Sequence, residues 1–168
     1  MNRIARFEKV SFEQFAKDCK SLMYAYPESQ LKEIYEKITI PKRATTGSAG
    51  YDFMTPFSLR LWPREKVVVP SGIRCYIEEG YCMLGFVRSS LGIKKDINLS
   101  NETIVLDGDY YDADNEGHIM ISLRNVGNKN FHCEAGERLV QGVFLPFGIT
   151  EDDSVSEIRT GGIGSTNT

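Results

Sequence analysis

The sequence lacks any long apolar run. No stretch of about eighteen consecutive apolar residues occurs in its 168 residues, which excludes a membrane-spanning helix of ordinary length. The opening MNRIARFEKV also lacks the apolar segment that a secretory signal peptide requires. We therefore expect a cytoplasmic protein with no membrane partner.

The sequence also lacks a basic surplus. Its 20 Lys and Arg are outnumbered by 23 Asp and Glu, which gives a formal net charge of -3 and a pI near 5.5. Nonspecific nucleic-acid binders usually carry excess positive charge, so no nucleic-acid partner is expected. The hydrophobic fraction of 41% is ordinary for a globular chain and argues against disorder, and the length suits a single domain.

Cysteine is scarce and shows no CxxC spacing. The four cysteines are scattered along the chain: Cys19, Cys75, Cys82 and Cys133. In a reducing compartment such cysteines remain thiols, so no disulfide is expected. A zinc site would have to combine His118, His132 and Cys133 without a CxxC pair, and the sequence therefore gives zinc no support.

Two short amphipathic helices are predicted before residue 40. Ser11 and Gln14 match a capping box, in which each side chain satisfies the other's backbone amide, and apolar residues then recur at helical spacing through residues 11–26. Pro27 ends this pattern. A second helix follows through Leu31, Ile34, Tyr35 and Ile38. We predict a helical N-terminal extension over residues 1–40 that packs on the rest of the chain.

After residue 40 the pattern changes to short apolar runs separated by turns. Ile73, Cys75 and Ile77 alternate with other residues, and Glu79 with Gly80 predicts a hairpin turn. Further strands are predicted in HIMISLRN and RLVQGVFLPF. So many short strands favour a sandwich or jelly-roll barrel, and we predict a mainly β core over residues 41–150 within one domain.

Five stretches, each unspecific alone, occur together in one order. They are SAGYDF, VRSSLGIK, NETIVLDGDYY, GERLVQGVFLPF and RTGGIGST. Turns, helix caps and solvated loops use the same residues, so only the joint order is specific. From Ala44 onward the chain resembles the trimeric dUTPases in all five family motifs. The opening RIARFEKVSFEQF resembles the helical extension of a bacterial and phage branch of that family.

The resemblance implies an architecture and an activity. It implies a jelly-roll β-barrel that forms a homotrimer, with residues 151–168 as a flexible arm exchanged between subunits. It also implies Mg²⁺-dependent hydrolysis of dUTP to dUMP and pyrophosphate, which removes dUTP and supplies dUMP for dTMP synthesis. Magnesium keeps several waters and commonly binds substrate phosphates, so no protein cage for it is expected.

The resemblance further implies roles for residues near the base, sugar and metal. Asp107 matches the catalytic carboxylate that orients a water toward the α-phosphorus, and an exposed aspartate is ionised at neutral pH. Tyr110 would exclude a ribose 2′-hydroxyl by its bulk, and Asn101 would help to read uracil. Ile163 would cover the base. Asp52 would act on Mg²⁺ through water only.

The phosphate groups need dense donors and cations, because negative charge develops on their nonbridging oxygens. The resemblance places Ser89 at the α,β-bridging oxygen and Arg159 at the γ-phosphate in a neighbouring subunit's site. Glycines of the arm would let its backbone approach the phosphates. The other implied phosphate contacts are Ser90, Gly92, Lys94, Gln141, Gly161, Gly162, Gly164, Ser165 and Thr166.

Three departures from the family pattern carry expectations. Ile163 stands where the family has an aromatic residue that stacks on uracil, so we expect weaker closure of the arm. Ile104 stands where glycine is usual. The stretch YDADNEGHI after Tyr110 is longer than usual, which predicts an enlarged loop beside the site. Its acids are expected to be solvated: Asp112, Asp114 and Glu116.

Two other functions stay open. A dCTP deaminase has the same fold, but it needs a glutamate placed to shuttle protons at the base, and no such motif is evident. A nucleotide-switched regulator would use the apolar face from Phe12 to Met23, or the enlarged loop, to bind a protein partner.

Overall fold

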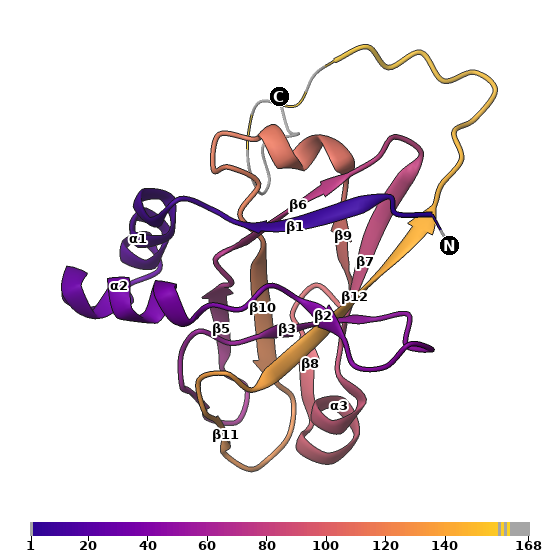
Figure 1. Ribbon diagram of the computed structural model, residues 1–168. Helices are drawn as coiled ribbons and strands as arrows, with labels where there is room; N and C mark the ends of the chain where they lie inside the picture. Colours follow the sequence, from indigo (N-terminus) through magenta and orange to yellow (C-terminus); the bar gives the residue numbers. More distant parts are fainter. Residues whose placement is uncertain (1, 158, 160, 162–168) are drawn as a thin grey trace.

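A computed structural model describes residues 2–157, 159 and 161 (Figure 1). Its body is mainly β, as predicted, and every strand pairing among these residues is antiparallel. The largest sheet has the order β2–β3–β12–β7–β9. Its strands are Lys42–Arg43, Tyr51–Met54, Arg138–Pro146, Tyr81–Val87 and Ile104–Leu106.

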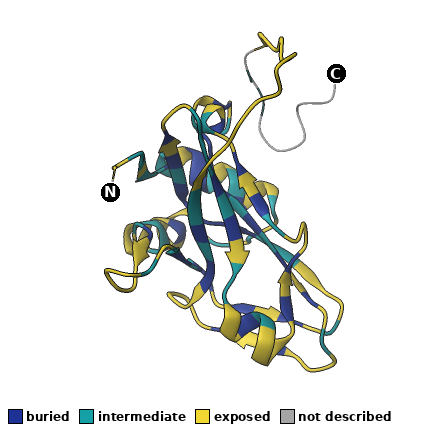
Figure 2. Cartoon of the chain, turned by 90° about the vertical axis from the view of Figure 1, so that its right-hand side faces the viewer, coloured by how far each residue is buried: buried dark blue, intermediate teal, exposed yellow. Residues whose placement is uncertain are grey.

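Three smaller sheets complete the body. The order β5–β10–β8 joins Lys66–Pro70, Met120–Asn125 and Ile97–Leu99. Strand β11 (Phe131–Cys133) pairs with β4 (Leu59–Leu61), and β1 (Ala5–Lys9) pairs with β6 (Ile73–Ile77). Alternate residues of these strands point inward, and the buried residues gather between the sheets while the loops are exposed (Figure 2).

The two predicted helices are present as α1 (Phe12–Ser21) and α2 (Glu28–Lys37). Both lie on one side of the β body (Figure 1). Phe15 of α1 is fully buried and its ring stacks on that of Phe57, with centroids 6.0 Å apart. Tyr24, just after α1, packs on the same ring at 4.4 Å. The predicted apolar face therefore docks the extension through Phe15 and Cys19, whereas Met23 lies after the end of α1 and is 81% exposed.

The predicted capping box is only half correct. Ser11 Oγ accepts a hydrogen bond from the Gln14 amide at 3.1 Å, as predicted. The Ser11 amide instead donates to Glu116 Oε2 at 2.7 Å, while Gln14 Nε2 donates to Asp18 at 2.8 Å. A carboxylate is a stronger acceptor than a neutral amide oxygen, so Glu116 takes this place. Glu116 is therefore a cap of α1, and the expectation of a solvated loop charge was wrong for this residue.

Strand β1 was not predicted, and the hairpin predicted at Glu79 and Gly80 is also different in the structure. The turn after β6 is present, with Gly80 at φ +81° and the Tyr81 amide donating to Glu78 O at 3.2 Å. However, β6 and β7 do not pair with each other. Strand β6 pairs with β1, and β7 lies between β12 and β9. The predicted hairpin is thus a turn between two sheets, since β6 pairs with β1 and β7 pairs with β12 and β9.

The cysteines of the described chain are all free thiols, as expected. Cys19, Cys75 and Cys133 are buried, and burial raises the pKa of Cys75 to about 12, so this thiol stays protonated near neutral pH. Across residues 2–157, 159 and 161, the helices are all too short or too polar to cross a membrane.

We expect acid to weaken the docking of α1. Burial raises the pKa of Glu116, but hydrogen bonds from Ser11 outweigh it and lower that pKa below its ordinary 4.5. A pKa lowered by folding stabilises the protein above the unfolded-state pKa, and this stabilisation is lost as pH falls through the folded-state value. Urea unfolding of wild type and Glu116→Gln, between about pH 7 and about pH 3.5, should show a shallower loss of unfolding free energy in the variant.

The exposed Glu79 provides the control for this measurement. Glu79→Gln should follow the wild-type pH dependence. Identical slopes for wild type and Glu116→Gln would contradict a stabilising role of the Ser11–Glu116 contact.

Candidate active site

Predicted phosphate residues from two segments of the chain, α3 and β12, line a common open hollow. Helix α3 (Ser89–Lys95) contributes Ser89, Ser90 and Lys94, and Gln141 approaches from β12. Arg88 and Ile93 complete the lining of a space of about 390 Å³. Gly92 lies on the same helix. The structure thus brings together the residues of VRSSLGIK and GERLVQGVFLPF that the sequence assigned to phosphate.

The hollow is rich in hydrogen-bond donors because α3 begins there. The amides of Leu91 and Gly92 donate to Arg88 O at 2.9 and 3.0 Å, so the amides of Ser89 and Ser90 precede the first helical hydrogen bonds. Two exposed serine hydroxyls and the Lys94 ammonium lie on the same short helix. This donor set suits an anion with several oxygens, such as a phosphate chain.

Gly50 leaves room for the Gln141 side chain, and it was not among the predicted site residues. A Cβ at Gly50 would lie 2.8 Å from Gln141 Oε1, which is closer than real contacts allow. Strand pairing sets Gln141 opposite Asp52 on one side and Phe86 on the other. The glycine of SAGYDF was the available signal for this role, since a glycine beside a strand often marks close approach by another group.

Asp52 faces two arginines. Its side chain is nearly buried, with Oδ1 3.3 Å from Arg88 Nε and Oδ2 3.4 Å from Arg138 Nη1. Within the described ranges, no group of three or more His, Cys, Asp or Glu side chains could hold a metal ion. Asp52 is therefore not a ready direct ligand, and the zinc alternative also gains no support from these residues.

The other predicted catalytic residues lie at the short 3-10 helix η1 (Gly108–Asp112). Asp107 precedes η1 and its side chain is half exposed. Tyr110 is buried, and its hydroxyl donates to His118 O at 3.0 Å and accepts from Asn115 Nδ2 at 2.8 Å. Burial raises the pKa of Tyr110, so the hydroxyl keeps its proton near neutral pH.

Arg159 lies against η1 of its own chain. Its Nη2 is 3.4 Å from Asp107 Oδ2, its Nη1 is 3.6 Å from Asp109 Oδ1, and its guanidinium lies 5.5 Å from the centre of the Tyr110 ring. The described segment after β12 turns back toward the end of the body where η1 lies (Figure 1). Gly161 is half-buried. The other predicted arm residues lie outside the described part of the chain: Gly162, Ile163, Gly164, Ser165 and Thr166.

The two groups of predicted residues are far apart in one chain. Leu106, the last residue of β9, pairs with Met83 near the start of β7, so Asp107 lies near the start of β7. Ser89 follows the other end of β7. Ser89 lies six positions after Met83, which corresponds to about 20 Å at the rise of an extended strand. Figure 1 shows η1 and α3 at opposite ends of the body. A single chain therefore does not assemble the site that the motifs predicted.

Asn101 is exposed in the turn from β8 to β9. Its carbonyl accepts a hydrogen bond from the Thr103 amide at 2.6 Å. Ile104, the departure from the family glycine, is buried opposite Gly85. A Cβ at Gly85 would lie 2.9 Å from Ile104 Cβ, so the larger residue fills the space left by the glycine of the partner strand.

The family model described as dUTPase matches residues 36–167. The chain belongs to the dUTPase family. It is 42% identical over 132 residues to a deoxyuridine 5'-triphosphate nucleotidohydrolase of Lactococcus lactis, covering 77% of this chain and 88% of that protein. A relative of the same name from Tolumonas auensis is 36% identical over 140 residues, covering 79% of this chain and 89% of the relative.

Solved dUTPase structures share the fold. The Streptococcus mutans dUTPase is 34% identical, with a TM-score of 0.65, covering 86% of this chain and 98% of that one. A Staphylococcus phage 80alpha dUTPase variant crystallised with dUpNHpp is 20% identical, with a TM-score of 0.66, covering 95% and 100%. At that identity the phage protein supports the fold alone. Helix α1 lies before residue 36, and so outside the segment that defines the dUTPase family.

Proposed function

We propose that this dUTPase hydrolyses dUTP to dUMP and pyrophosphate, which removes dUTP and supplies dUMP for dTMP synthesis. The observation that carries the proposal is the exposed Asp107 carboxylate beside the buried Tyr110, on a body that also holds a donor-rich hollow at α3. The 42% identity to the nucleotidohydrolase of Lactococcus lactis supports the same substrate.

The proposed site requires more than one chain. The two groups of residues lie about 20 Å apart along β7, so the α3 hollow of one chain must meet η1 of another. We therefore propose a homotrimer with shared sites, in which the arm also passes to a neighbouring subunit.

The outer face of the largest sheet supports such an assembly. Leu84 lies opposite Val105 and Val143 on the neighbouring strands, and Phe86 and Leu145 are exposed on the same sheet. Val105 is 62% exposed in the single chain. A contiguous apolar sheet face of this kind suits contact with further copies of the chain.

In the proposed reaction, Asp107 holds a water in line with the α-phosphorus and accepts its proton as the oxygen attacks. The bond from this phosphorus to the α,β-bridging oxygen breaks, and pyrophosphate leaves. Ser89 and the first amides of α3 in a second chain stabilise the charge on the bridging and nonbridging oxygens. Lys94 and Gln141 extend the same contacts along the phosphates.

Specificity is proposed to come from the turn between β8 and β9 and from η1. Asn101 and the backbone of its turn would read uracil. Tyr110 is held by two hydrogen bonds, so its ring cannot easily yield to a 2′-hydroxyl. Arg159 would leave Asp107 for the γ-phosphate, because a triphosphate offers a guanidinium more negative charge than one carboxylate.

Magnesium is proposed to arrive with the substrate. Both Asp52 oxygens face arginines, so this chain offers Mg²⁺ at most a contact through water. A phosphate-bound ion that keeps its waters needs no protein cage and neutralises triphosphate charge. A structural Mg(II) ion is coordinated in a mutant dUTPase of the Staphylococcus aureus phage phi11, a protein 20% identical to this one.

The structure gives less support to the two alternative functions, a dCTP deaminase and a nucleotide-switched regulator. A deaminase needs a glutamate free to shuttle protons at the base, but Glu116, the glutamate nearest Tyr110 in sequence, is bound to Ser11 by two hydrogen bonds. A protein partner that binds the N-terminal helices or the loop after Tyr110 stays a prediction.

The purified protein with Mg²⁺ should release pyrophosphate from dUTP at least about 100-fold faster than from dCTP, dTTP or UTP. The measurement is kcat/KM for each nucleotide, with an EDTA-treated sample as the metal control. Equal rates on dUTP and UTP would contradict the role given to Tyr110. Ammonia release from dCTP would favour the deaminase instead.

A further inference from the structure

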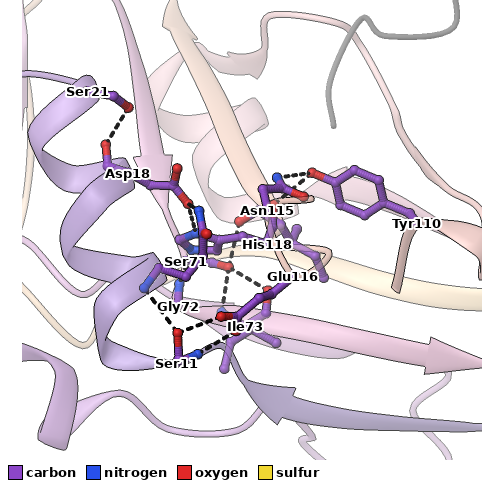
Figure 3. Close-up of polar contacts among 12 residues, drawn as sticks. Ser11, Asp18, Ser21, Ser71, Gly72, Ile73, Tyr110, Asn115, Glu116 and His118 are labelled. Atoms are coloured by element: carbon purple, nitrogen blue, oxygen red, sulfur yellow. Dashed lines mark hydrogen bonds and ion pairs between the residues drawn. The ribbon is translucent and has the colours of Figure 1, made fainter. Parts of the chain in front are cut away.

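Polar contacts join the N-terminal segment to the chain around η1, between residues about a hundred positions apart. Figure 3 shows those of Ser11 with Glu116 and of Asp18 with His118. Three pairs make these contacts: Glu8 with Tyr111 at 2.6 Å, Ser11 with Glu116 at 2.6 Å, and Asp18 with His118 at 2.6 Å. All three fall on the stretch that directly follows Asp107. The extension is therefore attached to the predicted catalytic segment itself.

The contact between Asp18 and His118 is one of two hydrogen bonds that fix the imidazole of His118. His118 is fully buried, and its Nε2 faces the Gly72 amide at 2.8 Å. Because that amide can only donate, Nε2 must accept, and the ring proton of neutral His118 sits on Nδ1. Nδ1 then donates to Asp18 Oδ2, which also accepts from Gln14 Nε2 at 2.8 Å. The ring orientation is thus set by α1 on one side and by the turn before β6 on the other.

The same residue also holds Tyr110. The carbonyl of His118 accepts the Tyr110 hydroxyl at 3.0 Å, and Asn115 donates to that hydroxyl at 2.8 Å. A continuous path therefore runs from Asp18 through His118 to Tyr110 (Figure 3). A shift of the His118 backbone would move the acceptor that sets the depth of the tyrosine ring.

We infer that α1 is a positioning element for the sugar site: Asp18, acting through His118, sets the position of Tyr110 and so the discrimination between deoxyribose and ribose. The inference rests on the proposed function, in which Tyr110 excludes the 2′-hydroxyl. Asp18 would thus add a contact from outside the part of the chain that matches the dUTPase family, residues 36–167. A neutral side chain with an oxygen in the same place should still hold the His118 ring in position, since the contact needs only an acceptor.

The test compares Asp18→Ala with Asp18→Asn in the full-length protein. Alanine leaves the buried Nδ1–H of His118 without its acceptor, whereas the asparagine oxygen can accept from both His118 and Gln14. We expect the ratio of kcat/KM for dUTP to kcat/KM for UTP to fall about tenfold in Asp18→Ala and to stay within about twofold of wild type in Asp18→Asn.

Cys19→Ala is the matched control. Cys19 is the next residue of α1 and is fully buried, but its side chain makes none of these hydrogen bonds. Its loss should lower the melting temperature and leave the dUTP to UTP ratio unchanged. A ratio that falls equally in Cys19→Ala and Asp18→Ala would mean that α1 acts by packing alone, and it would overturn the inference.

The other possible results of these experiments also bear on the inference or on the proposed function. An unchanged ratio in folded Asp18→Ala overturns the inference while the proposed function stands. If Asp18→Ala does not fold, Asp18→Leu takes its place with the same criterion, because leucine is similar in shape to aspartate and has no acceptor. If wild type does not hydrolyse dUTP, the proposed function fails. Hydrogen–deuterium exchange of residues 108–118 then still tests the positioning, with faster exchange expected in the alanine or leucine variant than in Asp18→Asn.

Discussion

Asp107→Asn should lower kcat for dUTP by about 10³-fold with little change in KM, because the amide cannot accept the proton of the attacking water. Asp107 is half exposed and its only ion pair in the described chain is with Arg159, so its loss should change the free energy of unfolding by less than about 0.5 kcal/mol. Steady-state kinetics with dUTP and thermal unfolding of the same preparation check both statements.

Asp109→Asn is the control for charge. Asp109 lies on η1, two residues after Asp107, is similarly exposed and also faces Arg159, at 3.6 Å. Its variant should lose less than about tenfold in kcat, because it is not placed to hold the water. A wild-type kcat in Asp107→Asn would remove Asp107 from the mechanism, and equal losses in both variants would point to Arg159 as the common cause.

Two inactive variants should restore activity when they share a trimer. Ser89→Ala should lose about 10²-fold in kcat by removing a donor to the phosphates. Ser89 and Asp107 lie at opposite ends of β7, so each proposed site takes them from different chains. A trimer that contains both variants then keeps about one intact site in three and should show about one third of wild-type activity.

This experiment requires coexpression of the two variants with different tags and purification through both. Each variant alone, purified in the same way with two tags, provides the baseline. Mixed trimers no more active than this baseline would show that one chain supplies both residues, contrary to the proposed shared site. A protein that sediments as a monomer with and without a nonhydrolysable dUTP analogue would contradict the trimer directly.

Local signals in the sequence predicted the elements of this fold well. The spacing of Phe15 and Cys19 placed α1 with its docking face, and Gly80 marked the turn after β6, because these features depend on neighbours within a turn or two. The motif order also predicted which residues of α3 and β12 would meet, since Ser89 and Gln141 do line one hollow.

Contacts between distant segments were not predictable in the same way. Glu116 looked like a solvated acid because nothing near it in the sequence needs a carboxylate, yet Ser11 reaches it from 105 residues away. Asp52 looked free to act toward a metal until Arg88 and Arg138 were placed beside it. No local pattern indicated that residues 5–9 would pair with β6.

The sequence by itself determined the family and the two N-terminal helices, and it indicated Asp107 as the proposed catalytic carboxylate, because each of these is contained in short motifs or in periodic apolar residues. The tertiary structure decided that Asp107 and Ser89 stand at opposite ends of β7, and that α1 holds Tyr110 through His118. Those arrangements depend on which distant strands and side chains become neighbours. Neighbours of that kind are chosen by the packing of the whole chain, which no local pattern records.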